Sequence, residues 1–552
     1  MYSTINNAEN NMIKIDGLGV KNFRALKNLE LVTLKPINIL VGRNSAGKST
    51  FARLLPLLKQ SSERAKTAPI LWWGRLVDFG MFEDVYSTNS TDGHIDVTVR
   101  FNVDETIVLN RRALWRAHDA PMSTASPIDV TFRLGKDDDG RTALRELHLN
   151  VFGIDLLLTI SGGVISTVRA DGQTIEIPQN IKLVWTQGSL LPLIRTVNIT
   201  PTQQSSVSDE SLFAPRRISR FGVHAARRAV GHFVHGNTQE DRLDEIVDRL
   251  PIAPISEFLK FCQNLPSSTV TWKATIAQTT VKSGALRQLQ IAVIVYKLDL
   301  LLSVLDEAAQ RHLTSVSYLE PLRATAQRYY RREEISTDEL DPKGLNTPFF
   351  VQGLTPRERE SLQTWTSENF GFSLSVKNSG GHLSLNIQSS DEGTPSRNMA
   401  DVGLGYSQLV PVAVQLWAAA RRSQNAVRRV AAGGRPVHEH LSPTVVVEQP
   451  ELHLHPAYQA RLADVFAVAV APVQQPDGRV KSSPLTIIAE THSPNLISRL
   501  GELINSGKLP AEQVQILVFE DSRESSGGAS VRVAKFDSKG VLSNWPIGFF
   551  DA

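Results

Sequence analysis

The segment Gly42–Ser49 reads GRNSAGKS and matches the pattern G-x-x-x-x-G-K-[S/T]. It follows the apolar run Ile37–Val41, which is typical of a buried strand. It precedes Thr50–Leu58, where apolar residues recur at helical spacing. In such a strand–loop–helix unit the glycines let backbone N–H groups turn toward a phosphate, and the helix N-terminus faces the same anion. A plain glycine-rich turn is the alternative, but the strand and helix on either side favour nucleotide binding.

The chemistry of this loop predicts ATP and Mg²⁺ as cofactors. Lys48 is expected to place its charge between the β- and γ-phosphates, and the Ser49 hydroxyl to ligate Mg²⁺. Pro56 is expected to kink the helix that follows. The residues of the loop that we expect to contact nucleotide are Gly42, Arg43, Asn44, Ser45, Ala46, Gly47, Lys48, Ser49 and Thr50.

The apolar run Thr444–Val447 leads to a carboxylate at Glu448. A carboxylate at a strand end near a phosphate loop can hold the water shell of Mg²⁺, whereas by itself it could equally be a solvated acid. Gln449 and Glu451 follow, and either could orient the water that attacks the γ-phosphate. The histidines near this strand match no familiar zinc spacing.

Two further segments carry polar groups suited to phosphate. His492 follows the apolar strand Leu485–Ala489 and is expected to sense or polarise the γ-phosphate through a hydrogen bond. The loop Gly403–Gln408 reads GLGYSQ and precedes a helix expected over Val410–Arg422. It combines glycines, a hydroxyl and a helix N-terminus, although a plain turn with an N-cap would look the same.

Composition places the chain among globular proteins. Of its 552 residues, 41% are hydrophobic and 21% are charged, and 59 basic against 56 acidic residues leave a net charge of +3. That charge is too small to indicate a nucleic-acid partner. The single cysteine, Cys262, excludes an internal disulfide and suits a reducing compartment. With no secretory signal and no apolar run of about 20 residues, a cytoplasmic protein is expected.

The two ends of the chain read as halves of one nucleotide-binding domain. Alternating apolar residues over 94–109 and 128–177 predict antiparallel strands, and Leu286–Leu313 predicts one long amphipathic helix. The expected fold class is α/β, with a mixed sheet, an antiparallel β subdomain and a mixed α+β insertion. The expected parts are residues 1–135 with the phosphate loop, 136–313 as the insertion, and 314–552 with Glu448 and His492.

The order of these segments resembles the ABC-type ATPase heads of the SMC, RecF and OLD-like group. The resemblance is carried by Lys21-Asn22-Phe23-Arg24, Gly42–Thr50, Gly403–Gln408, Val445–Pro456 and Thr491-His492-Ser493. Within that group, Glu448–Pro456 and the tail Asn544–Asp551 are similar to bacterial AAA-type ATPases with a C-terminal domain of unknown function. Such proteins often occur in anti-phage systems, including Septu-type and retron-linked ATPases that work beside an HNH nuclease.

The resemblance implies a homodimer closed by ATP. Gly405 and Ser407 of one subunit would cap the γ-phosphate bound to Lys48 of the other. It also gives Glu448 the role of the Walker B acid and His492 that of the switch histidine, and it adds Arg24 to the nucleotide-binding set.

The chain departs from this family at Gln449, where an ABC ATPase usually has its catalytic glutamate. Glutamine can position water but cannot accept its proton. Hydrolysis is therefore expected to be slow, to depend on Glu451, or to be controlled by a partner.

The resemblance implies a defence ATPase that controls a separate effector, an HNH-type nuclease in particular. The alternative is a DNA repair or maintenance ATPase of the RecF or SMC kind that binds DNA directly. A self-contained nuclease is disfavoured, because no carboxylates cluster after His492. One basic cluster could be a solvated helix face or a surface for nucleic acid or an acidic partner. It consists of Arg216, Arg217, Arg220, Arg227 and Arg228.

Overall fold

The protein, represented by a computed structural model, contains two compact units. Unit 1 comprises residues 1–20, 61–71 and 92–310, and unit 2 comprises residues 21–60, 72–91 and 311–552. The structure describes residues 13–544 except for 65, 67, 88–89, 106–120, 177–180, 185–187, 197–221, 267–268, 332–336, 338, 391–392, 394, 432–442, 475–479, 482–484 and 522–528.

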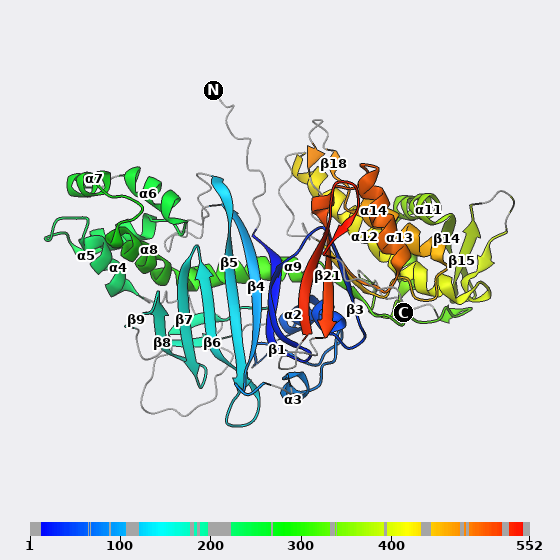
Figure 1. Ribbon diagram of the computed structural model, residues 1–552, viewed down its shortest axis with the longest axis horizontal. Helices are drawn as coiled ribbons and strands as arrows, with labels where there is room; N and C mark the ends of the chain where they lie inside the picture. Colours follow the sequence, from blue (N-terminus) through cyan, green and yellow to red (C-terminus); the bar gives the residue numbers. More distant parts are fainter. Residues whose placement is uncertain are drawn as a thin grey trace. The chain divides into compact units, whose positions relative to one another are not determined.

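The sheet of unit 1 is built from antiparallel hairpins over β4–β8 (Figure 1). Its strands follow in the order β11-β10-β8-β7-β6-β5-β4-β1, and β9 pairs with β8. Buried residues alternate with more exposed ones along β7, because successive side chains of a strand point to opposite faces. The predicted antiparallel β subdomain is confirmed. The strands are β1 (Lys14–Phe23), β4 (Ile95–Glu105), β5 (Pro121–Lys136), β6 (Thr142–Val151), β7 (Ile154–Ser161), β8 (Val164–Ala170), β9 (Gln173–Ile175), β10 (Ile181–Val184) and β11 (Leu193–Thr196).

The prediction of one long helix over Leu286–Leu313 is wrong, because two helices at an angle of 64° to each other occupy this segment. The break falls at Lys297, which is 0% exposed. Its ammonium group donates to the carbonyl oxygens of Asp248, at 2.9 Å, and Leu250, at 2.6 Å. These carbonyls lie at the end of a neighbouring helix, where no further helical N–H can reach them. The helices are α4 (Val223–Gly231), α5 (Glu240–Arg249), α6 (Ile255–Gln263), α7 (Val270–Ala277), α8 (Gly284–Tyr296) and α9 (Leu298–Thr314).

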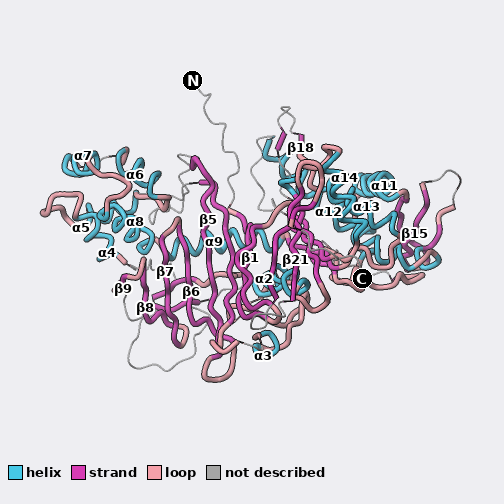
Figure 2. The backbone as a smooth tube through the Cα atoms, in the orientation of Figure 1, coloured by secondary structure: helices cyan, strands magenta, loops and turns pink. Residues whose placement is uncertain are grey.

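Unit 2 contains a mixed sheet of seven strands in the order β12-β17-β20-β3-β21-β22-β23. In Figure 2 its strand β21 is magenta and the helices α12, α13 and α14 of the same unit are cyan. Neighbouring strands from β12 to β21 are parallel, whereas β22 and β23 are antiparallel to their neighbours. Parallel strands end at the same edge, so the loops after β3, β17 and β20 come together. The predicted α/β class with a mixed sheet is confirmed. The strands are β3 (Ile37–Gly42), β12 (Val316–Leu319), β17 (Thr444–Glu448), β20 (Thr486–Glu490), β21 (Val514–Asp521), β22 (Ala529–Phe536) and β23 (Leu542–Ser543).

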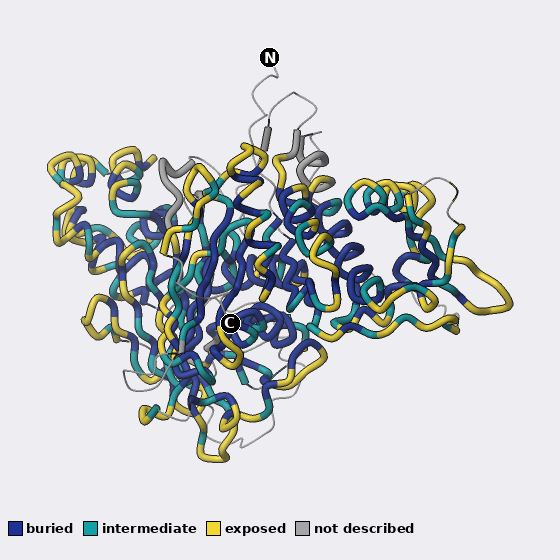
Figure 3. Tube along the Cα trace, turned by 45° about the vertical axis from the view of Figure 1, so that its right-hand side comes forward, coloured by how far each residue is buried: buried dark blue, intermediate teal, exposed yellow. Residues whose placement is uncertain are grey.

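Helices pack beside this sheet and bury its central strands. All five residues of β17 are buried, as expected for a strand covered on both faces. In Figure 3 the dark blue stretches run through the sheets and the inner faces of the helices. The helices are α1 (Lys48–Ala52), α2 (Leu54–Ser62), α3 (Phe82–Val85), α10 (Thr347–Gly353), α11 (Pro356–Phe370), α12 (Leu404–Ala431), α13 (Pro456–Ala469) and α14 (Pro494–Asn505), with short 3₁₀ turns η2 (Met399–Asp401) and η3 (Ala511–Gln513).

Unit 2 also contains the strand β2, which follows β1 in the strand order, and two small antiparallel sheets. The first sheet has the order β13-β15-β14 with β16 paired to β15, and the second pairs β18 with β19. These strands are β2 (Leu26–Thr33), β13 (Tyr330–Arg331), β14 (Phe372–Ser379), β15 (His382–Ser389), β16 (Arg397–Asn398), β18 (Val473–Gln474) and β19 (Val480–Lys481).

Two helices of unit 2 differ from their predicted bounds. The helix after the phosphate loop breaks at Arg53, between α1 and α2, rather than at Pro56. Pro56 falls in the first turn of α2, where its missing N–H costs nothing. Helix α12 begins at Leu404 instead of Val410, so Ser407 belongs to its first turns.

Among the described residues, no single helix has both the length and the apolar composition to cross a membrane. The bent pair α8 and α9 satisfies these two criteria when it is taken together.

Candidate functional site

The phosphate loop connects β3 to α1 and depends on two glycines. Gly42 has a φ of 149°, and a Cβ there would lie 2.3 Å from the carbonyl oxygen of Phe519. Gly47 has a φ of 95°, and its Cβ would lie 2.6 Å from the Leu26 side chain. L-residues rarely adopt these conformations, so neither position accepts a side chain without strain. The loop shape therefore follows from the glycines that defined the motif.

Lys48 lies across this loop. Its ammonium group donates to the carbonyl oxygens of Gly42, at 2.9 Å, and Arg43, at 2.7 Å. It also lies 3.8 Å from a carboxylate oxygen of Glu490. Burial lowers the pKa of Lys48, while the neighbouring Glu490 raises it. The lysine thus lies over the backbone of the phosphate loop, and its contact with phosphate stays a prediction.

The Ser49 hydroxyl contacts Glu490. The hydroxyl donates to the Glu490 carboxylate at 2.7 Å. Glu490 ends β20 and pairs in register with Glu448 at the end of β17. Burial raises the pKa of Glu490, its bond to Ser49 lowers it, and the nearby Glu448 raises it. Two buried carboxylates therefore stand side by side at this edge of the sheet.

The Glu448 carboxylate accepts hydrogen bonds from two side chains. Arg53 donates to both of its oxygens, at 2.6 and 2.8 Å, and the Tyr318 hydroxyl donates to one at 2.8 Å. Glu448 is 2% exposed. Burial is the largest single effect and lowers the pKa of Arg53, but the hydrogen bond to Glu448 and the electrostatic interactions with Tyr318 and Glu448 together raise it more, so the net direction is upward. The structure does not bring the predicted pair Ser49 and Glu448 into contact with each other.

Gln449 follows β17 at a turn with a φ of 43°. Its N–H donates to the carbonyl oxygen of Glu490 at 2.8 Å. Arg323 donates to the carbonyl oxygens of Glu448, at 2.6 Å, and Gln449, at 3.3 Å. Burial lowers the pKa of Arg323 to about 10. A buried arginine thereby fixes the backbone that presents Gln449.

Glu451 and His492 are brought together. A Glu451 carboxylate oxygen accepts the backbone N–H of His492 at 2.6 Å, and its second oxygen is buried without a hydrogen-bond partner. Burial raises the pKa of Glu451. Burial, followed by the charge of Lys48, lowers the pKa of His492. The histidine is exposed, and the lowered pKa means that it loses its proton at a lower pH than an ordinary histidine.

The serine loop is held inside its own unit. The Ser407 hydroxyl accepts the N–H of Ala326 at 3.1 Å, and Ser407 is 3% exposed. Gln408 exchanges hydrogen bonds with the backbone of Arg323 at 3.1 and 3.0 Å. Gly405 is half-buried and follows the exposed Leu404. The backbone around Gly405 is thus more accessible to a second subunit than the Ser407 hydroxyl.

Arg24 lies outside this cluster of contacts. It has a φ of 51°, and its guanidinium donates to the carbonyl oxygen of Phe79 at 3.2 Å and lies 4.7 Å from the centre of that ring. Within the loop, Arg43, Asn44 and Ser45 are exposed. The contacts of Arg24 hold it against its own unit, and its nucleotide role stays a prediction.

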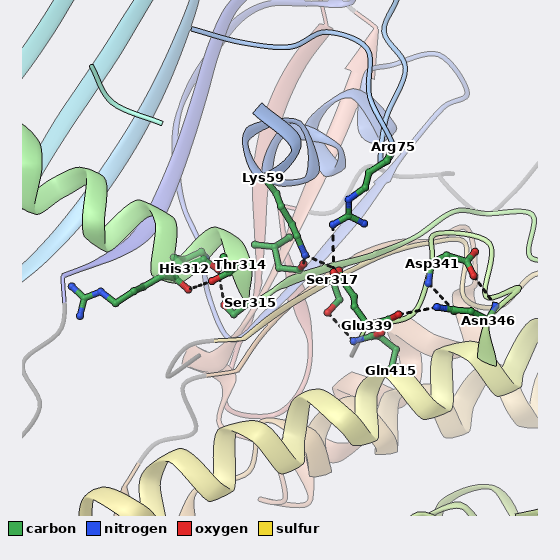
Figure 4. A network of polar contacts seen from close by, with 12 residues as sticks. Lys59, Arg75, His312, Thr314, Ser315, Ser317, Glu339, Asp341, Asn346 and Gln415 are labelled. Carbon is green, nitrogen blue, oxygen red and sulfur yellow. Dashed lines mark hydrogen bonds and ion pairs between the residues drawn. The ribbon is translucent and has the colours of Figure 1, made fainter. Parts of the chain in front are cut away.

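A polar network supports the helix that follows the phosphate loop (Figure 4). Lys59 on α2 donates to Glu339 at 2.7 Å and to the carbonyl oxygen of Val316 on β12 at 2.6 Å. Gln415 on α12 donates to Ser317 of the same strand at 2.7 Å. Strand β12 thus contacts both the helix of the phosphate loop and the helix of the serine loop.

The basic cluster is only partly described. Arg216, Arg217 and Arg220 lie outside the described residues. Arg227 donates to both oxygens of Asp244 at 2.7 Å and also pairs with Glu240. These bonds tie α4 to α5, while Arg228 is exposed. The contacts of Arg227 agree with a helix face whose charged groups pair within the same unit.

Sequence reasoning missed three residues of the site: Glu490, Arg53 and Arg323. Glu490 had a signal, because it ends an apolar strand just as Glu448 does. Arg53 and Arg323 had none, because their contacts with Glu448 join positions far apart in the chain.

Comparisons with known families agree with the two ends of this site. Residues 13–176 match the family described as AAA ATPase domain. Residues 305–498 match the family described as AAA domain, putative AbiEii toxin, Type IV TA system. The chain carries a divided AAA-type ATPase domain. Residues 509–552 match a family of unknown function, DUF3696, which confirms the predicted C-terminal domain of that kind.

Solved structures with some similarity are SMC head domains. One comes from Pyrococcus furiosus, with an extended coiled coil and bound to the C-terminal domain of ScpA. It has 11% identity and a TM-score of 0.35 over 95% of this chain and 97% of that chain. The SMC head of Thermotoga maritima has 9% identity and a TM-score of 0.30 over 94% and 98%. Scores this low do not establish a common fold. No curated protein matches the chain.

Proposed function

We propose that unit 2 binds ATP with Mg²⁺ at the loop Gly42–Thr50 and hydrolyses it slowly. The observation that carries the proposal is the meeting of Lys48 and Ser49 with Glu490 at the carboxyl end of β20. Lysine, backbone N–H groups and a hydroxyl beside carboxylates are the groups that nucleotide phosphates and their cation require.

The residues present fit a Mg²⁺ ion whose ligands come partly from the protein and partly from the nucleotide. Among the described residues, no group of three or more His, Cys, Asp or Glu side chains is placed to hold a metal alone. Mg²⁺ commonly takes only one or two protein ligands and completes its shell with phosphate oxygens and water. Ser49 and a strand-end carboxylate supply oxygen ligands of that kind. When bound, the cation would neutralise charge that develops on the phosphates.

The remaining groups act on the attacking water. Gln449 can orient a water but cannot accept its proton. Glu451 has one buried oxygen without a partner, and burial raises its pKa, which makes it the available proton acceptor near His492. His492, whose pKa is lowered by desolvation and by the charge of Lys48, can in its neutral form donate one hydrogen bond toward a γ-phosphate. Slow turnover follows from this division of roles.

A binding measurement tests the first step. Purified wild-type protein should bind a fluorescent ATP analogue with Mg²⁺, and Lys48→Ala should bind it at least about 10-fold more weakly, because a charged hydrogen bond is lost. Lys508→Ala removes an exposed lysine of the same unit and should bind like the wild type. Equal affinity of all three proteins would contradict the assigned phosphate loop.

ATP binding is further proposed to close a homodimer that works as a switch in anti-phage defence in the cytoplasm and controls an effector, an HNH-type nuclease. This part is supported by the resemblance of the segment Glu448–Pro456 and by the match to a family described as a putative toxin of a toxin–antitoxin system. Cells that carry the chain with its neighbouring genes should resist phage, and Lys48→Ala should abolish resistance while Lys508→Ala retains it. Salt-dependent DNA binding by the chain alone, without resistance, would favour the DNA-maintenance alternative.

A further inference from the structure

The predicted metal-binding pair is not the pair that the structure brings together. A serine hydroxyl that ligates a cation through its oxygen has one hydrogen left to donate, and a carboxylate is the usual acceptor. Here the Ser49 hydroxyl donates to Glu490 at 2.7 Å. Glu490 is 4% exposed and stands 3.8 Å from the Lys48 ammonium. The carboxylate nearest to both functional groups of the loop is therefore Glu490.

Glu448 has little capacity left for a cation. Arg53 binds both of its oxygens, and the Tyr318 hydroxyl binds one of them. A two-point arginine–carboxylate pair is among the stronger hydrogen-bonded contacts in proteins. A cation at Glu448 would have to displace the guanidinium of Arg53, whose side chain is 27% exposed, from a carboxylate that is 2% exposed, and this two-point contact would be lost. The pair thus neutralises Glu448 within the fold.

We propose that Glu490, together with Ser49, holds the divalent cation of the bound nucleotide, while Glu448 serves as the fixed partner of Arg53. The inference rests on the proposed function, since it assigns the metal ligands of that ATP site. It moves the metal-binding carboxylate from the strand β17 to its neighbour β20. It also explains why an acid, rather than an apolar residue, ends β20 two positions before His492.

Glu490 suits the role because its position is fixed from both sides. Its backbone carbonyl accepts the N–H of Gln449 at 2.8 Å, and β20 lies between β17 and β3. The strand that carries Glu490 is therefore the direct neighbour of the strand that leads into the phosphate loop. Glu448 is one strand further away.

The test measures how Mg²⁺ changes nucleotide affinity, not turnover. The proteins are wild type, Glu490→Gln, Glu448→Gln and Glu512→Gln, the last removing an exposed carboxylate of unit 2 as the matched control. The probe is a fluorescent ATP analogue, titrated with and without Mg²⁺. Electron paramagnetic resonance of Mn²⁺ with ATP reports cation binding directly. A melting curve of each protein verifies that it is folded.

Glu490→Gln should bind the metal-free nucleotide at least as well as the wild type, because Lys48 and the loop are intact and a negative charge is gone. It should lose about 10-fold or more of the affinity gained with Mg²⁺, and its bound Mn²⁺ signal. Glu448→Gln should keep the Mg²⁺ effect but melt at a lower temperature, because Arg53 loses its charged partner. Glu512→Gln should match the wild type in every measurement.

The opposite result, in which Glu448→Gln loses the Mg²⁺ effect and Glu490→Gln keeps it, would overturn the inference while leaving ATP binding in place. A wild-type protein that binds no nucleotide would instead refute the proposed function itself. If Glu490→Gln does not fold, Glu490→Asp retains the charge but withdraws it from Ser49. An unchanged Mg²⁺ effect in that variant also counts against the inference.

Discussion

The backbone of Gln449 is fixed at three points of the site. Its N–H is bonded to Glu490, its carbonyl oxygen accepts hydrogen bonds from Arg323 and from the N–H of Leu452, and its φ is 43°. A left-handed conformation costs a non-glycine residue free energy and persists only where surrounding contacts impose it. The side chain at this position is therefore presented from a rigid turn, so its chemistry can be changed without moving the backbone.

Gln449→Glu should raise steady-state phosphate release by about 10-fold or more, because the new carboxylate can accept the proton of the attacking water. The same assay on Gln449→Ala should give a rate no higher than that of the wild type. Nucleotide affinity, measured in parallel, should change little in both variants. A rate for Gln449→Glu equal to the wild-type rate would show that Glu451 or a partner, and not this position, limits hydrolysis.

The sequence predicted the residues of the site that belong to local motifs. Lys48 and Glu448 could be placed because a short segment defines the element on which each lies. Arg323 could not, since it contacts Glu448 from a segment with no pattern of its own, 125 positions earlier. Glu490 was given no role, because only the register of β17 and β20 brings it beside Glu448.

Elements were predicted more reliably than their ends. The strands β3, β17 and β20 lie where apolar runs predicted them, because buried parallel strands are apolar on both faces. The break between α8 and α9 was missed, because Lys297 interrupts an otherwise continuous apolar face and its bonding to α5 depends on tertiary structure. Such a break depends on hydrogen-bond partners from other elements, which the spacing of apolar residues along the sequence does not reveal.

Helix α2 is tied to β12 by Lys59, whose side chain is 3% exposed. Glu339→Gln would remove the carboxylate that this buried ammonium contacts at 2.7 Å and keep its bond to the Val316 carbonyl. Because Glu339 is itself 26% exposed, the free energy of unfolding should fall by about 1–3 kcal/mol, less than for a fully buried pair. Urea unfolding followed by circular dichroism measures this loss. Glu512→Gln is the control, and a loss as small as that of the control would refute the role of the network.

The segment after α2 contains another lysine of interest, the half-buried Lys66 in unit 1. Its ammonium group donates to the carbonyl oxygen of Pro69 at 2.8 Å, and burial lowers its pKa to about 7, against an opposing contribution from Asp306 on α9. In the unfolded chain a lysine stays protonated to about pH 10. Between these values unfolding takes up a proton, so stability rises with pH.

The wild type should therefore gain stability over Lys66→Met as the pH is raised from 7 to 9, by up to about 1.4 kcal/mol per pH unit. Below pH 7 the lysine is protonated in both states, and the difference between the two proteins should be constant. Urea unfolding at a series of pH values provides the comparison. A difference that stays the same from pH 6 to 9 would mean that Lys66 keeps its ordinary pKa.

At the level of the whole chain, the two units divide the sequence differently from the predicted parts. The ATPase residues from both ends meet in unit 2, and unit 1 collects the antiparallel sheet and helices α4–α8. The boundaries predicted at 135 and 313 stay a prediction, because a compact unit need not coincide with a unit of function. The sequence did predict that the distant halves meet, since a phosphate loop needs a carboxylate at a neighbouring strand end for its cation.

The proposed dimer depends on the start of α12, where Leu404 is 44% exposed beside the half-buried Gly405. Light scattering after gel filtration should show a monomer without nucleotide and a dimer with a non-hydrolysable ATP analogue and Mg²⁺. Leu404→Glu should keep wild-type nucleotide affinity but remain a monomer, because a carboxylate would face the phosphates of the second subunit. Val541→Glu, which changes a residue that is 60% exposed elsewhere in unit 2, should still dimerise. If Leu404→Glu dimerises as the wild type does, the subunits do not meet at this helix end. If the wild type stays a monomer with saturating analogue, ATP does not close a dimer.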